Sequence, residues 1–129
     1  MKFLFVEEVI EAHTQIIQIY GGLDGIRDMG LLISAIEMPK ASFFGEFLHV
    51  SMFDKAAAYL FHIVCNYPFL DGNKRTGTAA ALIFLDMNEI ELDFDEMELE
   101  ELVVKTAAGK SDKEEISQFF SIHAINLSQ

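Results

Sequence analysis

The stretch YPFLDGNKRTG, residues 67–77, lies between two strongly apolar segments. The first segment, residues 51–67, is rich in alanine, and Pro68 ends it because proline cannot continue a helix. The Asp71-Gly72 pair forms a turn, and Asn73 is a candidate N-cap for a second helix over residues 73–88. The stretch therefore predicts two buried helices joined by a short loop, with Gly77 at the point where they pack closely.

Further elements are predicted on both sides of this pair. Apolar residues at helical spacing predict a helix over residues 6–20 that ends at the Gly21-Gly22 pair. Asp28 and Ser51 are candidate N-caps. The other predicted elements are a helix over 29–38 that stops before Pro39, a small hairpin or extended flap within 40–50, a short extended segment at 92–95, and amphipathic helices over 96–109 and 113–127. The predicted fold class is all-α with one small β-hairpin flap, in a single domain spanning residues 1–129.

Composition narrows the class of protein. The 129 residues are 51% hydrophobic and include 12 Phe, which favours one folded domain over disorder. No apolar run reaches the length of a membrane span, and acids follow the N-terminus too early for a signal peptide. The sequence therefore predicts no membrane association and a cytoplasmic location. A single cysteine, Cys65, excludes an internal disulfide and a cysteine-based zinc site.

The formal net charge of −12 argues against nucleic acid as a partner, because phosphate neutralisation needs clustered Lys and Arg. The acids concentrate in residues 86–103. This run fits two interpretations, a solvated helix face and a docking surface for a basic partner. In so acidic a chain the adjacent pair Lys74 and Arg75 stands out.

The loop and the start of the second helix contain the parts of an anion site. The first N–H groups of a helix have no internal partner and carry partial positive charge. Gly72 allows successive N–H groups to converge, and Asn73 can donate an amide to a phosphate oxygen. Lys74 adds a point charge, Arg75 a bidentate fork, and Asp71 an oxygen ligand suited to Mg²⁺. These residue types favour a triphosphate site, although the chain contains no P-loop pattern.

The same residues also fit an ordinary helix start, in which an Asp-Gly turn, an Asn cap and exposed basic residues have no ligand. Phe69 is interpreted as a core residue that anchors the loop. The remaining histidines, His13, His49 and His123, are scattered along the chain and are interpreted as surface or satisfied core residues rather than metal ligands.

The full string PFLDGNKR resembles the signature loop of the Fic/Doc family, whose pattern is His-Pro-Phe, two residues, Gly-Asn, then Gly or Lys, then Arg. The resemblance extends to IYGGLDGIRDMGLLISAIEMPKASFFGE, which is similar to the first half of Doc-type toxins. The segment DKAAAYLFHIVCNYPFLDGNKRTGTAAALIFLDMN is similar to their central helix pair. About the first ninety residues are covered. The resemblance implies the Fic/Doc helical bundle with its β-hairpin flap.

The resemblance also implies an activity. A lysine at position 74, where Fic proteins have a second glycine, places the chain with the Doc branch. That branch binds ATP and Mg²⁺ with the γ-phosphate forward and phosphorylates elongation factor Tu, which blocks translation. Asp71 would hold Mg²⁺, and Gly72, Asn73, Lys74 and Arg75 would hold the phosphates. A Phd-like antitoxin would be the partner, and the flap would bind an extended target segment by strand addition.

One position departs from the family pattern, because Tyr67 stands where the family has its catalytic histidine. Histidine, with a pKa near 6.5, accepts a proton from the target hydroxyl at neutral pH, whereas a tyrosine with a pKa near 10 keeps its own. His62 does not replace it, because it lies within the preceding helix. Loss of a general base typically costs about a hundred- to ten-thousandfold in rate. We therefore expect activity that is reduced or lost.

Three alternatives remain open at this stage. The chain fits a toxin with an impaired base and also a non-catalytic Fic-like binding module. Transfer of a nucleotidyl (AMP) group is the third alternative, and Lys74 argues against it. The sequence is equally consistent with a natural and an introduced Tyr67.

Overall fold

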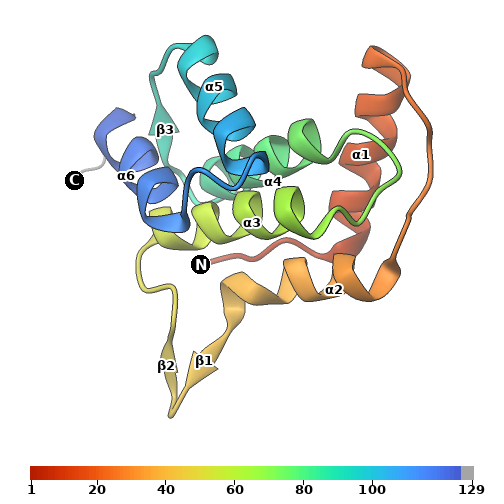
Figure 1. Ribbon diagram of the computed structural model, residues 1–129. Helices are drawn as coiled ribbons and strands as arrows, with labels where there is room; N and C mark the ends of the chain where they lie inside the picture. The colour runs from red at the N-terminus through yellow and green to blue at the C-terminus, as the bar shows by residue number, and fades with distance from the viewer. Residues whose placement is uncertain (126–129) are drawn as a thin grey trace.

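The computed structural model describes residues 1–125, and the elements lie around a central pair of long helices, α3 and α4 (Figure 1). The helices are α1 (Val6–Tyr20), α2 (Met29–Glu37), the 3-10 helix η1 (Met38–Lys40), α3 (Met52–Asn66), α4 (Asn73–Met87), α5 (Glu96–Ala107) and α6 (Lys113–His123). The strands are β1 (Ser42–Phe43), β2 (Glu46–Phe47), β3 (Glu91–Leu92) and β4 (Ala124–Ile125). The predicted all-α class with a small hairpin is confirmed.

Helices α3 and α4 pack closely at a glycine. A Cβ atom on Gly77 would lie 2.8 Å from Val64 Cγ2 and 3.1 Å from the Leu60 carbonyl oxygen. Only a residue without a side chain fits there. The prediction that Gly77 marks the close contact is confirmed.

Local capping signals explain where several helices begin. The Asp28 carboxylate accepts a hydrogen bond from the Leu31 N–H at the start of α2. The Ser51 hydroxyl and Asp54 form a reciprocal capping box at the start of α3. At the other end of α1, Gly21 adopts a positive φ of 85°. These caps agree with the predicted boundaries, apart from the last turn of α2, which tightens into η1 around Pro39.

Two lysines attach the hairpin and α6 to α3. The buried Lys55 ammonium donates to the carbonyl oxygens of His49 and Val50, at 2.7 and 2.8 Å, and lies over the Phe47 ring. The Lys113 Nζ, at the start of α6, lies 3.0 Å from Nε2 of both His49 and His62. These contacts fix the base of the hairpin and the N-terminus of α6 against one helix.

The prediction for the last helix is wrong at its C-terminal end. The sequence predicts a helix over residues 113–127, but α6 ends at His123, and residues 124–125 form β4, which pairs antiparallel with β3. Residues 126 and 127 lie outside the described part of the chain. The short extended segment expected at 92–95 begins one residue earlier, as the two-residue strand β3, which pairs with Ala124–Ile125.

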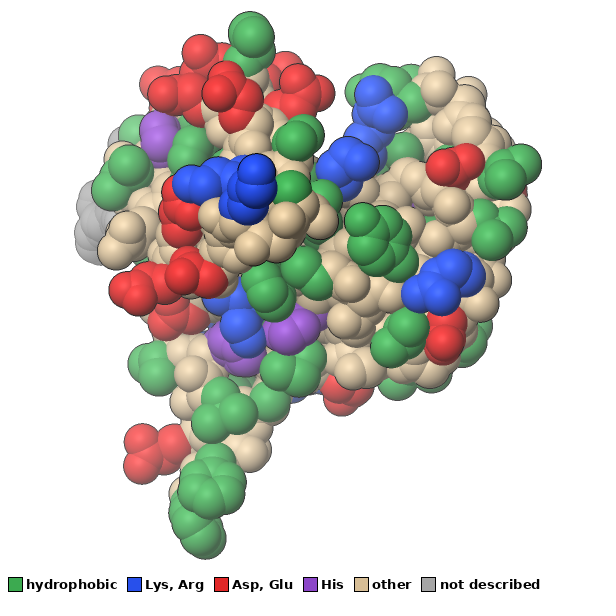
Figure 2. All heavy atoms as spheres, viewed as in Figure 1, with side chains coloured by type: hydrophobic (Ala, Val, Ile, Leu, Met, Phe, Trp, Pro, Cys, Tyr) green, Lys and Arg blue, Asp and Glu red, His purple; other side chains and the backbone are tan. Residues whose placement is uncertain are grey.

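The hairpin β1–β2 extends away from the helices and exposes apolar side chains at its tip (Figures 1 and 2). Phe44, at the turn, is 91% exposed, and Phe43 is also exposed. Within residues 1–125, no helix combines the length and hydropathy required to cross a bilayer.

Candidate functional site

The loop between α3 and α4 is held in place by a segment from the N-terminal third of the chain. The backbone N–H groups of Arg27 and Asp28 donate to the Pro68 carbonyl oxygen at 2.7 and 3.1 Å. Leu70 N–H donates to the Gly25 carbonyl oxygen at 3.0 Å, and Ile26 and Phe69 form an isolated β-bridge. The conformation of the loop therefore depends on backbone hydrogen bonds to residues 25–28, which lie outside the 67–77 stretch.

Tyr67 occupies the C-terminus of α3 in a left-handed conformation, with φ 51° and ψ 53°. Arg27 caps this end: its Nε donates to the Tyr67 carbonyl oxygen, and its Nη2 donates to that of Asn66 at 2.9 Å. A cation is favourable at the C-terminus of a helix. The side chain of Tyr67 is half exposed, and Tyr67 is not among the described residues that line the groove defined below.

Asn73 closes the loop on itself. Its Oδ1 accepts from the Phe69 N–H at 2.9 Å, and its Nδ2 donates to the Phe69 carbonyl oxygen at 3.0 Å. The expectation that Asn73 is the N-cap is wrong: the cap position is Gly72, with φ 80°, and Asn73 is the first helical residue. Because both ends of its side-chain amide bond the Phe69 backbone, the main role of Asn73 is to stabilise the conformation of the loop.

The resulting helix start leaves backbone donors free. The first helical bond of α4 runs from Thr76 N–H to the Gly72 carbonyl oxygen. Within residues 1–125 the N–H groups of Gly72, Asn73, Lys74 and Arg75 make no hydrogen bond. Four adjacent N–H groups at a helix N-terminus form a strong anion-binding arrangement.

The residues that carry these donors line a groove of about 1070 Å³ between α4 and α5. Every residue from Asp71 to Arg75 lines it, so the structure brings together five of the six residues predicted for the site. Lys74 and Arg75 are exposed, and the Arg75 guanidinium carbon lies 4.1 Å from the centroid of the Tyr20 ring. Apolar residues of α1, α4 and α5 form much of the remaining wall, among them Ile16, Leu82, Leu99, Val103 and Val104.

The Asp71 carboxylate has one oxygen engaged and one available. Its Oδ2 accepts from the Leu23 N–H at 2.8 Å, and no hydrogen bond within the described residues uses Oδ1. Within that part of the chain, no group of three or more His, Cys, Asp and Glu side chains could hold a metal ion. Mg²⁺ is commonly held by one or two carboxylates together with water and substrate phosphates. The single carboxylate beside the free N–H groups fits that pattern.

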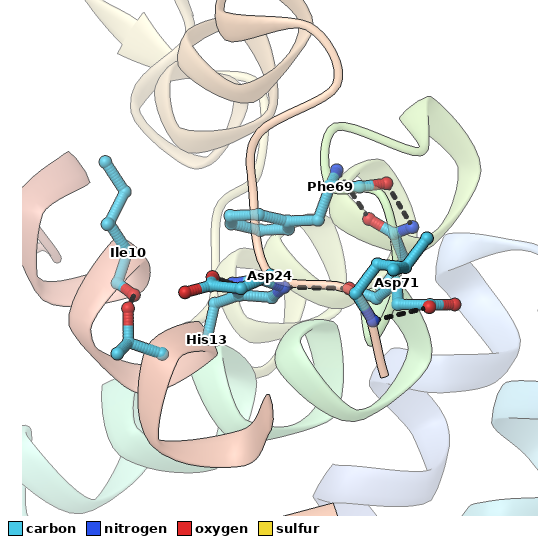
Figure 3. A network of polar contacts seen from close by, with 8 residues as sticks. Ile10, His13, Asp24, Phe69 and Asp71 are labelled. Atoms are coloured by element: carbon cyan, nitrogen blue, oxygen red, sulfur yellow. Dashed lines mark hydrogen bonds and ion pairs between the residues drawn. The ribbon is translucent and has the colours of Figure 1, made fainter. Parts of the chain in front are cut away.

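A histidine from α1 lies beneath the loop (Figure 3). The His13 side chain is 2% exposed and its Nε2 lies 2.8 Å from the Asp71 carbonyl oxygen. Its ring stacks on Phe69, with centroids 3.8 Å apart and planes 8° apart. The sequence-based interpretation of His13 as an ordinary histidine gave it no part in the site. Its place within the apolar stripe of residues 6–20 was the signal, because a polar ring on a buried face needs a partner.

The α5 side of the groove also carries charged residues of both signs. Glu96, Glu100 and Glu101 of α5 line it together with Lys105 and Lys110. Figure 2 shows acidic side chains gathered over the outer end of α5. Of the nine acidic residues in 86–103, four lie on the exposed face of α5 and three of these border the groove, whereas the other five lie in α4, β3 and the connecting segments.

Comparisons with known proteins find similarity over most of the chain. The model of the Fic/DOC family matches residues 3–85. The chain is 39% identical over 100 residues to a protein named Toxin Doc from Mycolicibacterium smegmatis, covering 76% of this chain and 77% of that one. It is 36% identical over 110 residues to a protein named Protein kinase doc from Escherichia phage P1, covering 85% and 86%.

Proposed function

Because the chain belongs to the Fic/DOC family and is a Doc-type member of it, we propose that it binds ATP in the groove between α4 and α5 and transfers the γ-phosphate to a protein hydroxyl. The observation that carries the proposal is the row of four N–H groups from Gly72 to Arg75, which make no hydrogen bond within residues 1–125 and lie beside the charged side chains of Lys74 and Arg75. Phosphoryl transfer depends mainly on positioning and charge stabilisation, and these groups supply both.

Each residue of the loop has a role in this proposal. The N–H groups and Lys74 bind phosphate oxygens, and the Arg75 fork binds two oxygens at once. Asp71 holds Mg²⁺, which when bound offsets the charge on the phosphates. Asn73 keeps the loop closed through its two bonds to Phe69. The aliphatic wall of α5 offers an apolar surface to the nucleoside.

The orientation of ATP rests on Lys74. A side chain at this position fills part of the nest of N–H groups that a glycine leaves open, and its ammonium creates a second anion position. We therefore favour γ-phosphate transfer over transfer of the AMP group. By analogy with a relative named a protein kinase, we assign this chain to the same reaction class.

The partners proposed for the chain follow from its toxin relatives. A protein related to toxins of this type is expected to be produced with an antitoxin, here one of the Phd type, in the cytoplasm. Elongation factor Tu is the proposed target, docked as an extended segment against the edge of the hairpin β1–β2, where main-chain groups can add a strand.

Labelled nucleotide tests the reaction class. The Tyr67→His form, which restores the family's histidine, is incubated with purified elongation factor Tu and Mg²⁺, with ATP labelled on either the α- or the γ-phosphate. Label from the γ-phosphate alone supports the proposal. Label from the α-phosphate identifies an AMP transferase, and a Lys74→Gly change added to Tyr67→His should abolish γ-transfer.

A second function is favoured by one observation. Tyr67 replaces the proton acceptor and does not line the groove, so a protein that binds nucleotide or a partner without turnover fits the same site. A Tyr67→His form that is folded and binds ATP yet labels no protein in a cell lysate would establish this non-catalytic function.

A further inference from the structure

The contact between His13 and the loop leads to an inference about how the anion site is shaped. Asp71 is the residue that immediately precedes the four free N–H groups. Its carbonyl oxygen turns toward α1, where His13 Nε2 lies at 2.8 Å. A peptide group that points its oxygen to one side points the following N–H to the other. By holding the Asp71 carbonyl, the hydrogen bond from His13 also fixes the direction of the Gly72 N–H, which belongs to the same peptide group.

The tautomer of His13 follows from this contact. A carbonyl oxygen only accepts, so the ring nitrogen that faces it, Nε2, must carry a proton. The other nitrogen, Nδ1, lies 3.8 Å from an Asp24 carboxylate oxygen, which is too far for a hydrogen bond. The hydrogen bond of the His13 ring is therefore the one to the Asp71 carbonyl oxygen of the loop.

The ring is also fixed in orientation. Phe69 stacks on its face, and Phe69 is itself held by Asn73 through two hydrogen bonds. A Cβ atom on Gly72 would lie 3.5 Å from His13 Cδ2, so the loop backbone passes close to the ring edge. Figure 3 shows the His13 ring beneath that of Phe69, with the dashed contact running from its nitrogen to Asp71. The ring stack and the hydrogen bond together fix the position and the orientation of the loop relative to α1.

We propose that His13 is a positioning residue of the nucleotide site: its Nε2–H holds the Asp71 carbonyl away from the groove, so that the N–H groups of Gly72 to Arg75 and the Asp71 carboxylate face the phosphates. The inference rests on the proposed function for its ligand. The arrangement of the loop itself does not depend on that function.

Two substitutions separate the two parts of the contact. His13→Phe keeps a ring against Phe69 and removes the donor, whereas His13→Gln keeps an amide N–H that reaches the position of Nε2 and removes the stack. A matched control is available in α6, where His123 Nδ1 contacts the Phe119 carbonyl oxygen at 2.7 Å and its ring packs on that of Phe119. His123 does not line the groove among the described residues, so His123→Phe makes the same chemical change elsewhere.

Binding of Mg²⁺-ATP is measured by calorimetry at pH 7.5, on protein shown by circular dichroism to be folded. His13→Phe should weaken binding about tenfold, the effect of one lost hydrogen bond to a partly buried carbonyl. His13→Gln should recover part of that loss, and His123→Phe should bind like the parent protein. Equal affinity in the parent protein and His13→Phe would overturn the proposal and reduce His13 to a core residue.

A second measurement tests whether His13 positions the loop, and it applies even if the parent protein binds no nucleotide. Hydrogen exchange of the Phe69, Leu70 and Thr76 amides reports on the closed loop, because their bonds to Asn73, Gly25 and Gly72 depend on it. Without ligand, His13→Phe should speed their exchange while the amides in the middle of α3 keep theirs, and His13→Gln should partly restore protection. Unchanged exchange at these three amides would refute the positioning role.

Discussion

The guanidinium carbon of Arg75 lies 4.1 Å from the centre of the Tyr20 ring, so that the last residue of α1 meets the first turn of α4 at the rim of the groove. A guanidinium that stacks through its face keeps its N–H edge free for a carboxylate or phosphate. Tyr20 is largely exposed, and the pair is open to the groove. The contact with Tyr20 therefore positions the Arg75 guanidinium and leaves its N–H groups available to a phosphate.

The first prediction follows from this pair. Arg75→Ala should weaken Mg²⁺-ATP binding about tenfold or more, because it removes a charged hydrogen bond. Tyr20→Ala should weaken it less, since the guanidinium stays but loses its support. Calorimetry measures both, and Lys2→Ala, an exposed lysine outside the groove, is the control. An Arg75→Ala affinity equal to the control's would remove Arg75 from the site.

The second prediction concerns Tyr67. Tyr67→His should fold normally, because histidine is one of the residues enriched in the left-handed conformation that Tyr67 adopts. It should raise transfer of the γ-phosphate to elongation factor Tu by about a hundredfold or more, on the scale of a general base. Expression should become toxic without an antitoxin. Tyr67→Phe, which also lacks a usable base, should remain as slow as the parent protein.

Gly77 gives the third prediction. Gly77→Ala should lower the free energy of unfolding by about 1 to 2 kcal/mol, because overpacking against Val64 and the rigid Leu60 carbonyl outweighs the gain in helix propensity. Urea denaturation measures the change. Gly30→Ala is the control, since a Cβ there meets only Asp28 Oδ1 at 3.4 Å and should leave stability unchanged or raised. Equal effects of the two substitutions would contradict the close contact.

The fourth prediction is a pH dependence. Burial, together with the nearby Lys113 ammonium, lowers the pKa of His62 from 6.5 to about 4 and also lowers the pKa of His49. The unfolded chain therefore takes up protons below pH 6.5 that the folded protein does not, so stability falls as pH falls from about 6.5 toward 4. For His62 alone the loss between pH 7.5 and 5 is about 2 kcal/mol.

This dependence is measured by urea denaturation at a series of pH values. His62→Gln keeps an acceptor for Lys113 but does not titrate, so its stability should fall less over the same range. Lys113→Gln should flatten the curve in part, because it removes the ammonium but not the burial. A parent protein and His62→Gln with parallel curves would show that His62 does not contribute.

Most of the fold is predictable from the sequence because most of its signals are local. The glycine pair after Tyr20, the Asp28 and Ser51 caps and the break at Pro68 all act within a few residues of where they stand. The strand Ala124–Ile125 is not predictable in this way, because its partner lies at Glu91–Leu92 and no local pattern records that pairing.

The candidate site likewise has a part that is predictable from the sequence and a part that is not. Asp71 to Arg75 are contiguous in the chain, so their shared chemistry is evident from the sequence alone. The contributions of Arg27 and His13 are not, because these residues reach the loop across 40 and 58 positions and only packing brings them there. The groove wall on α5 is likewise a product of tertiary packing.

The hairpin has a consequence for how the protein could be divided and reassembled. A cut at its exposed tip, between Phe44 and Gly45, separates the residues that support the loop, such as His13 and Arg27, from the loop itself. Neither fragment would contain a complete site. The two, produced separately from the Tyr67→His form, should regain nucleotide binding only when mixed, so that fragment complementation gives a means of making a toxic activity conditional on the meeting of two harmless pieces.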